Sequence, residues 1–359
     1  MITSMGLRVD DDRGAEEHAM TFDRIGYWAW TDMEEAGQWL ATGTDPSAPE
    51  AVAWGVPLIA ACSRGSNEVV AALAAQASDV NVRGEDGRTP LWEAVWEANA
   101  GAIEALLAAG ADPWIEVMCG WSAGRLALAG PHASLFACLP GVVPLEEEHR
   151  AAIQRARERK TLLDNTAHLG GEWAVGMGLA LVAGISADEA IRRLGADPAR
   201  FAPHPPRPAP WLPEDEDDED EVDLYTAGLQ YVAVTEIAGG CALVQPEGFA
   251  VTLNETVNPL SAGTHCVAVY FNAKSGTQSS YVIDGEEVDR DPVSSDARPG
   301  ENPARTLNRF LYSWAQSRQD PIAAEIGYAF TLLGLDPGDG SCVKGPWSRW
   351  VQVPEWSRF

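Results

Sequence analysis

A segment of 33 residues recurs along the first part of the chain, and this period constrains the fold more than any other feature. Val56-Pro57-Leu58-Ile59-Ala60-Ala61 aligns with Thr89-Pro90-Leu91-Trp92-Glu93-Ala94 at an offset of 33 residues. A weaker third copy begins at Gly120, and residues 39–46 match the end of a degenerate leading copy. A period of this length predicts a solenoid in which each repeat packs on its neighbours.

Each repeat carries the signals of two short helices. Thr89 is a favourable N-cap residue, and Pro90 suits the first helical turn, where its missing N–H costs nothing. Gly110 can end the second helix in a backbone conformation that other residues reach only with strain. The motifs Gly87-Arg88-Thr89-Pro90-Leu91 and Leu106-Leu107-Ala108-Ala109-Gly110-Ala111-Asp112 resemble the ankyrin-repeat family. The resemblance implies an all-α solenoid of two good repeats flanked by degenerate caps, and a role in binding another protein.

The repeats depart from the ankyrin pattern at several positions. Trp92 replaces the usual histidine, and Glu93 occupies a position that is normally apolar. In the third copy Ala123-Gly124 stands in place of Pro-Leu, and Pro131 interrupts the pattern. Because only two repeats match well, we expect the array to depend on its caps and on a charged helix over residues 145–165.

Aromatic and charged side chains of the repeats predict a partner-binding surface. Eight of the 14 tryptophans fall between Trp28 and Trp121, and tryptophan and arginine rimmed by charge are typical of interface hot spots. Ankyrin proteins commonly present their inner helices and the hairpin fingers between repeats to a partner. The predicted partner-binding residues are Glu85, Asp86, Arg88, Trp92, Trp96, Glu97, Trp114, Glu116 and Met118. The alternative is that the tryptophans pack between repeats and stabilise a short array.

The acidic charge of the chain bears on the kind of partner. The formal net charge is −28, which disfavours contact with the phosphates of nucleic acid and would attract a basic protein. The alternative is that acidity only maintains solubility. Residues 202–223 combine six prolines with eight consecutive acidic residues. Such a composition predicts a disordered loop, either a solvated linker or a mimic of a polyanion.

The chain after residue 165 predicts an α+β domain with an antiparallel sheet. Strands are expected at residues 173–182, 229–237, 241–245, 249–253, 265–271 and 279–283, and helices at 186–195, 303–316 and 322–333. Gly239-Gly240 between two β-rich runs predicts a hairpin. The motifs at residues 185–197 and 239–249 resemble an actinobacterial family of domains of unknown function. This resemblance supports the fold prediction and implies no activity.

These patterns divide the chain into five parts. They are a polar N-terminal arm over residues 1–22, an ankyrin-repeat domain over 23–144, a connecting helix over 145–165, the α+β domain over 166–340 and a tail over 341–359. We expect the three tryptophans of the tail to pin it to the α+β domain. No signal peptide is recognisable, and three prolines interrupt the longest uncharged stretch, residues 126–145. Unpaired cysteines and a strong preference for arginine over lysine favour a cytoplasmic, bacterial protein.

Motifs for metals and nucleotide cofactors are missing from the sequence. The six histidines form no HExxH pair, the cysteines no CxxC pair, and no GxGxxG or GK[ST] motif occurs. We therefore predict no catalytic residues, no metal and no cofactor. The expected function is a cytoplasmic interaction module that binds a basic protein through the ankyrin concave face and fingers, as an immunity or inhibitor protein would. The alternatives are enzyme or ligand-binding activity in the α+β domain, with the repeats as targeting module, and a passive spacer. A pocket lined by convergent polar groups in residues 165–340 would favour ligand binding.

Overall fold

The chain divides into two compact units, each of which is described by itself. The computed structural model describes residues 31–48, 55–164, 176–202, 230–246, 248–272, 276–293, 296–313, 315–317, 320–354 and 356. The predicted N-terminal arm and almost all of the predicted acidic loop lie outside these residues. The first unit is Met1–Leu145 with Arg298–Pro303, and the second is Glu146–Ala297 with Ala304–Phe359.

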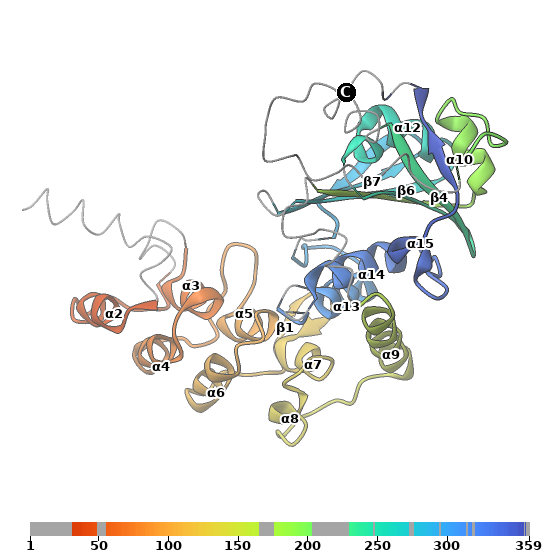
Figure 1. Ribbon diagram of the computed structural model, residues 1–359. Coiled ribbons are helices and arrows are strands. Elements are labelled where there is room, and N and C mark those ends of the chain that lie inside the picture. Colours follow the sequence, from red (N-terminus) through yellow and green to blue (C-terminus); the bar gives the residue numbers. More distant parts are fainter. Residues whose placement is uncertain are drawn as a thin grey trace, which may run out of the picture. The chain divides into compact units, whose positions relative to one another are not determined.

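Helices of the first unit follow the 33-residue period (Figure 1). The first helices of three successive repeats begin at residues 57, 90 and 123, and the second helices at 67, 100 and 133. The first helices are α3 (Pro57–Arg64), α5 (Pro90–Trp96) and α7 (Ala123–Ala127). The second helices are α4 (Asn67–Gln76), α6 (Ala100–Ala108) and α8 (Ala133–Phe136), and α2 (Met33–Leu40) precedes them all. The all-α repeat architecture predicted from the sequence is therefore confirmed, with short helices in the third copy.

Polar N-caps start most of these helices. The hydroxyl of Thr89 accepts from the backbone N–H of Trp92 at 3.2 Å, and Ser122 accepts from Arg125 at the same distance. A capping side chain of this kind satisfies one of the N–H groups that the first helical turn leaves without a partner. Helix α7 begins with Ala123-Gly124 instead of Pro-Leu. It still forms, because Ser122 provides the N-cap.

Small residues let neighbouring repeats approach closely. A Cβ added at Gly101 would lie 2.2 Å from the side chain of Asn67, in the equivalent helix one repeat earlier. At Gly124 it would lie 2.7 Å from the ring of Trp114. The glycine at position 124, where the ankyrin pattern has leucine, is thus required by the position of that ring.

The turns of successive repeats are joined by hydrogen bonds from one repeat to the next. The carboxylate of Asp45 accepts from the backbone N–H of Ser78 at 3.1 Å, and the amide oxygen of Asn81 accepts from the N–H of Asp112 at 2.8 Å. Hydrogen bonds from the side chain of Ser78 and from Ser47 hold the pKa of Asp45 well below its usual range. The turns therefore form a continuous, hydrogen-bonded edge of the array.

A seven-stranded antiparallel sheet forms the centre of the second unit. Its strand order is β8-β7-β6-β3-β5-β4-β9 (Figure 1). The strands are β3 (Met177–Ala183), β4 (Tyr231–Ile237), β5 (Gly240–Gln245), β6 (His265–Asn272), β7 (Gly276–Ile283), β8 (Glu286–Arg290) and β9 (Trp350–Gln352). The predicted α+β class with an antiparallel sheet is confirmed.

Helices cover both faces of this sheet. One face carries α10 (Ala187–Arg193), the 3₁₀ helix η3 (Ala250–Thr252) and α12 (Asn254–Ser261). The other carries α14 (Pro321–Leu333) and α15 (Ser341–Lys344), with α13 (Pro303–Tyr312) and α9 (Glu147–Leu162) among the remaining helices. Because β3 lies between two covered faces, nearly all of its residues are buried. This explains why its sequence is a continuous apolar run rather than an alternating one.

Helix α9 packs within the second unit. The guanidinium of Arg159 donates to the hydroxyl of Thr331 at 2.5 Å and to the carbonyl of Leu335 at 2.9 Å. The ammonium of Lys160 donates to the carbonyl of Leu311 at 2.9 Å. Burial lowers the pKa of this lysine. This helix therefore covers α14, and its expected support of the ankyrin array stays a prediction.

Several elements of the second unit differ from the sequence prediction. The strand expected at residues 249–253 is wrong, because these residues form η3 and the N-cap of α12. There the hydroxyl of Thr252 donates to the carbonyl of Phe249 at 2.7 Å, a local hydrogen bond that competes with strand pairing. Strands β8 and β9 and helices α12 and α15 were not predicted. Strand β9 pairs with β4, so the tail is part of the sheet, and Trp350 and Trp356 are buried there as expected.

Candidate functional site

A hairpin finger lies between α4 and α5, at the centre of the predicted surface. The N–H of Gly84 donates to the carbonyl of Arg88 at 2.9 Å, and Gly87 takes a positive φ of 82° at the turn. The carboxylate of Asp86 accepts from the backbone N–H of Arg88 at 3.0 Å. This tight turn leaves the side chains of Glu85 and Asp86 exposed at the tip.

Arg88 points back toward the helices instead of outward. Its guanidinium lies 3.0 Å from Asp86 and 3.3 Å from Glu93, and only 14% of its side chain is exposed. The carboxylate of Glu93 also accepts a hydrogen bond from the hydroxyl of Ser63 at 2.5 Å. Arg88 therefore joins its finger to the inner helix, and its charge is neutralised before any partner arrives.

Three of the predicted contact residues are buried, which corrects that prediction. Trp92 is 0% exposed, Trp96 3% and Met118 5%. The rings of Trp92 and Trp96 are stacked, with centroids 6.1 Å apart and planes inclined by 17°. For these two tryptophans the alternative is the better description, since both pack inside the repeats. Sequence reasoning failed here because helical spacing alone does not show which face of a short helix meets the next repeat.

The remaining predicted residues lie at or near the surface. Trp114 is half-buried, and its indole N–H donates to the carbonyl of Pro140 at 2.6 Å, so its ring braces the third repeat. Glu97 is half-buried as the residue that follows α5. Glu116 is exposed in β1 (Glu116–Met118), which pairs with β2 (Trp121–Ser122) in the next finger. The fingers thus bring together Glu85, Asp86 and Glu116 as an exposed set.

The positive charges of the repeats are engaged internally. The guanidinium of Arg83 donates to the carbonyls of Gly87 at 3.1 Å and Glu116 at 2.7 Å, which joins two successive fingers. That of Arg125 lies 5.2 Å from the ring centroid of Trp121. Together with Arg88, these are the arginine side chains of the repeats that the structure describes. The finger surface therefore carries more carboxylates than cations: Glu85, Asp86, Glu93 and Glu116 against Arg83 and Arg88.

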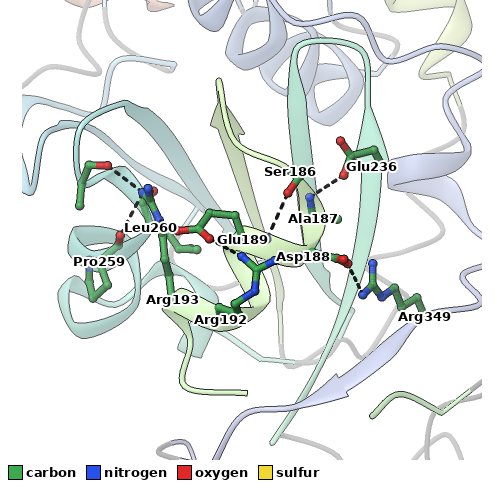
Figure 2. A network of polar contacts seen from close by, with 11 residues as sticks. Ser186, Ala187, Asp188, Glu189, Arg192, Arg193, Glu236, Pro259, Leu260 and Arg349 are labelled. Carbon is green, nitrogen blue, oxygen red and sulfur yellow. Dashed lines mark hydrogen bonds and ion pairs between the residues drawn. The ribbon is translucent and has the colours of Figure 1, made fainter. Parts of the chain in front are cut away.

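In the second unit, the conspicuous motif of residues 185–197 forms a polar network around α10 (Figure 2). The hydroxyl of Ser186 accepts from the N–H of Glu189 at 3.2 Å, and the carboxylate of Glu236 accepts from the N–H of Ala187 at 2.5 Å. Both contacts cap the start of α10. Asp188 is bonded to Arg349 at 2.5 Å, which ties the helix to the residue that precedes β9.

Arg193 extends this network to a second helix. It pairs with Glu189 at 3.0 Å, and its guanidinium donates to the carbonyls of Leu260 at 3.0 Å and Ala262 at 2.7 Å (Figure 2). These carbonyls end α12, where a cation is favoured by the helix dipole. The polar residues of the motif thus hold α10 against β4, α12 and the tail, which is a structural role.

Comparisons with known proteins agree with this division. Residues 28–116 match the family model "Ankyrin repeats (3 copies)", so the chain contains ankyrin repeats in its first unit. Residues 165–311 match the "Family of unknown function (DUF6461)", so its second unit contains a domain of that family. A search of curated proteins found no match. Ankyrin repeats are in general protein-interaction modules, and this supports an interaction role for the first unit.

Neither a metal-binding cluster nor a membrane-spanning helix is present within the described ranges. There, no three His, Cys, Asp or Glu side chains are grouped so that they could hold a metal ion. Also, none of the helices described combines the length and the apolar character that crossing a bilayer requires.

Proposed function

We propose that this protein binds a basic protein partner through the fingers of its ankyrin repeats. The observation that carries the proposal is the asymmetry of charge on the fingers. Glu85, Asp86 and Glu116 are exposed, whereas the guanidinium groups of Arg83 and Arg88 are held by carbonyls and carboxylates of the same unit. A cationic partner would therefore meet a net negative charge, since Arg88 pairs with Asp86 and Glu93 and leaves Glu85 and Glu116 as exposed carboxylates.

The expected contribution of this charge is mainly kinetic. Exposed carboxylates steer an oppositely charged partner during diffusional encounter, while each exposed ion pair adds little to affinity. An acidic inhibitor of a basic toxin or nuclease would gain association rate in this way. We therefore propose a cytoplasmic protein of the immunity or inhibitor type, acting by binding and without a catalytic step.

The first experiment is to isolate the partner from the native host with the full chain as bait. The double variant Glu85→Lys/Glu116→Lys reverses charge at two exposed finger positions. The single variant Glu104→Lys makes the same kind of change on α6, away from the fingers. We expect the double variant to bind the captured protein about tenfold more weakly, with most of the change in the association rate.

Three outcomes would contradict parts of this proposal. If Glu104→Lys weakens binding as much as the double variant, general acidity and not the finger surface attracts the partner. If the captured protein is itself acidic, the proposal of a basic partner is wrong. If deletion of residues 1–145 leaves capture unchanged, the repeats do not bind the partner.

Ligand binding by the second unit is the other candidate function, and one observation favours it. A cleft with convergent polar side chains lies between η3, α12 and strands β6 to β8. The repeats would then act as the targeting module of a ligand-binding protein.

A further inference from the structure

The cleft lies at one end of the sheet face that α12 covers. Its volume is about 410 Å³, within the range of roughly 300–1,000 Å³ that is usual for small-molecule sites. Three adjacent strands form its floor. Ala268 of β6 pairs with Ser280 of β7, and Ser280 pairs with Arg290 of β8. Directly paired residues project to the same face of a sheet, so these strands contribute to one surface.

The wall of the cleft exists because one glycine lets the chain lie directly on the sheet. A Cβ at Gly178 of β3 would lie 2.6 Å from the side chain of Val251 and 3.0 Å from the carbonyl of Gly248. The segment that contains η3 therefore rests on β3 and brings Thr252 and Asn254 to the cleft. This contact also explains why these residues do not form the strand that their sequence suggested.

A β-bulge in β8 places a charged pair in the cleft. Val282 pairs with Glu287, whereas its neighbour Tyr281 pairs with Asp289, so one residue of β8 is extra. In a regular strand, Glu287 and Arg290 would project to opposite faces, since they are three residues apart. The bulge turns both to the cleft, where they form an ion pair at 3.1 Å. Bulges often redirect side chains in this way beside binding sites.

Three other polar side chains in the cleft have no hydrogen-bond partner in the part of the chain that the structure describes. Asn254, Gln278 and Ser280 come from α12 and β7, and within the described chain their side chains make no hydrogen bond. An amide or a hydroxyl can both donate and accept a hydrogen bond. A ligand with many hydroxyl groups, which also donate and accept, would satisfy all three.

The charges and the aromatic wall narrow the class of ligand. Arg290 is already paired with Glu287, and the carboxylate of Asp291 accepts from the N–H of Ser279 at 3.0 Å. No excess positive charge lines the cleft, so an anionic ligand is disfavoured. The ring of Tyr270 adds an apolar surface, supported edge-on by Phe249 at 5.9 Å. We propose that this cleft binds a neutral, hydroxyl-rich small molecule of the saccharide class.

The test uses the full chain and saturation-transfer NMR with glucose, N-acetylglucosamine, maltose and trehalose as probes. Asn254→Ala removes a cleft amide. Asn258→Ala removes an exposed amide on the same helix that does not line the cleft. We expect transfer to at least one saccharide, and about fivefold weaker binding in Asn254→Ala and Gln278→Ala, as the loss of one hydrogen bond predicts. Asn258→Ala should bind like the unmodified protein.

Two controls make the outcome decisive. Thermal unfolding of each variant distinguishes a loss of binding from a loss of fold. Asn254 and Gln278 are exposed, so neither substitution removes a core contact. Inorganic phosphate and arginine serve as anionic and cationic probes. Absence of transfer to all four saccharides would overturn the proposal, as would binding of phosphate or arginine alone. Equal binding by Asn254→Ala and Asn258→Ala would place the saccharide elsewhere. None of these results depends on the ankyrin partner.

Discussion

The hydroxyl of Ser63 donates a hydrogen bond of 2.5 Å to the carboxylate of Glu93, 30 residues further along the chain. This bond joins α3 to α5, the inner helices of consecutive repeats. Glu93 is only 7% exposed, and Arg88 lies 3.3 Å from its second carboxylate oxygen. An acidic residue at a normally apolar position of the repeat is thus accommodated by two polar partners.

Glu93→Ala should lower the free energy of unfolding by about 1–3 kcal/mol, because the hydroxyl of Ser63 loses its acceptor and Arg88 keeps the exposed Asp86 as its ion-pair partner. Chemical denaturation measures this change. The double variant Arg88→Met/Glu93→Leu should recover most of the loss, since apolar residues of similar volume can replace a buried pair. If the double variant is as unstable as the single one, the pair contributes more than charge compensation.

Arg193→Ala should be more destabilising than Arg192→Ala, although both arginines pair with Glu189. Arg193 is 22% exposed and also donates to the carbonyls at the end of α12, whereas Arg192 is 55% exposed. We expect a loss of about 1–2 kcal/mol for Arg193→Ala, as for hydrogen bonds from a charged group. For Arg192→Ala the loss should be below about 0.5 kcal/mol. Equal effects in thermal unfolding would show that the bonds to α12 add nothing.

Glu325 should make the stability of the second unit fall as the pH rises. Burial raises the pKa of this carboxyl to about 7, although a hydrogen bond donated by Thr277 at 2.5 Å acts in the opposite direction. Between the ordinary value of 4.5 and about 7, the folded protein keeps a proton that the unfolded chain has lost. The stability that this proton provides is complete below the lower value and lost above the higher one.

The variant Glu325→Gln tests this prediction, because an amide resembles the protonated carboxyl. We expect the variant to match the unmodified protein near pH 4 and to exceed its unfolding free energy above pH 7 by on the order of 3 kcal/mol. Glu104→Gln, at an exposed position of the first unit, should have no such effect. Parallel pH profiles for the unmodified protein and Glu325→Gln would contradict the prediction.

Asp289→Asn should be strongly destabilising, because one carboxylate compensates two arginines. Arg309 lies 3.2 Å from Asp289, with 1% and 7% of their side chains exposed, and Arg305 pairs with the same carboxylate. Loss of this negative charge removes an ion-pair partner from the buried Arg309. We expect the free energy of unfolding, measured with denaturant, to fall by about 3 kcal/mol. Glu287→Gln, on the opposite face of β8, breaks a pair with the 78% exposed Arg290. Its cost should stay below about 0.5 kcal/mol, and a similar cost for both variants would refute the assigned role of Asp289.

The sequence was informative where structure depends on neighbours a few residues apart. The repeat period, the caps at Thr89 and Ser186 and the hairpin at Gly239-Gly240 could all be predicted, because each depends on local hydrogen bonds or backbone freedom. Strand β9 escaped prediction, since three residues after a run of turns carry too little periodicity. Its pairing with β4 depends on a strand more than a hundred residues away.

The candidate surfaces were predicted less well than the elements that carry them. Helical spacing placed Trp92 and Trp96 on an inner helix but could not show that both rings point into the repeat stack. Arg88 was recognised as a finger residue, yet its direction is set by Glu93, which the sequence marked only as a departure from the family pattern. The cleft of the second unit left no sequence motif, because its lining residues are brought together by strand register and a bulge.

The sequence by itself therefore determined the two classes of fold and where most helices and strands begin and end. The tertiary structure decided which side chains face solvent: it buried Trp92 and Trp96, turned Arg88 inward, and directed Glu287 and Arg290 to one face of the sheet. The physical reason is the sequence separation over which each kind of interaction acts. Backbone preferences and caps act over one helical turn, whereas burial and charge pairing are set by contacts between residues that lie far apart in the chain.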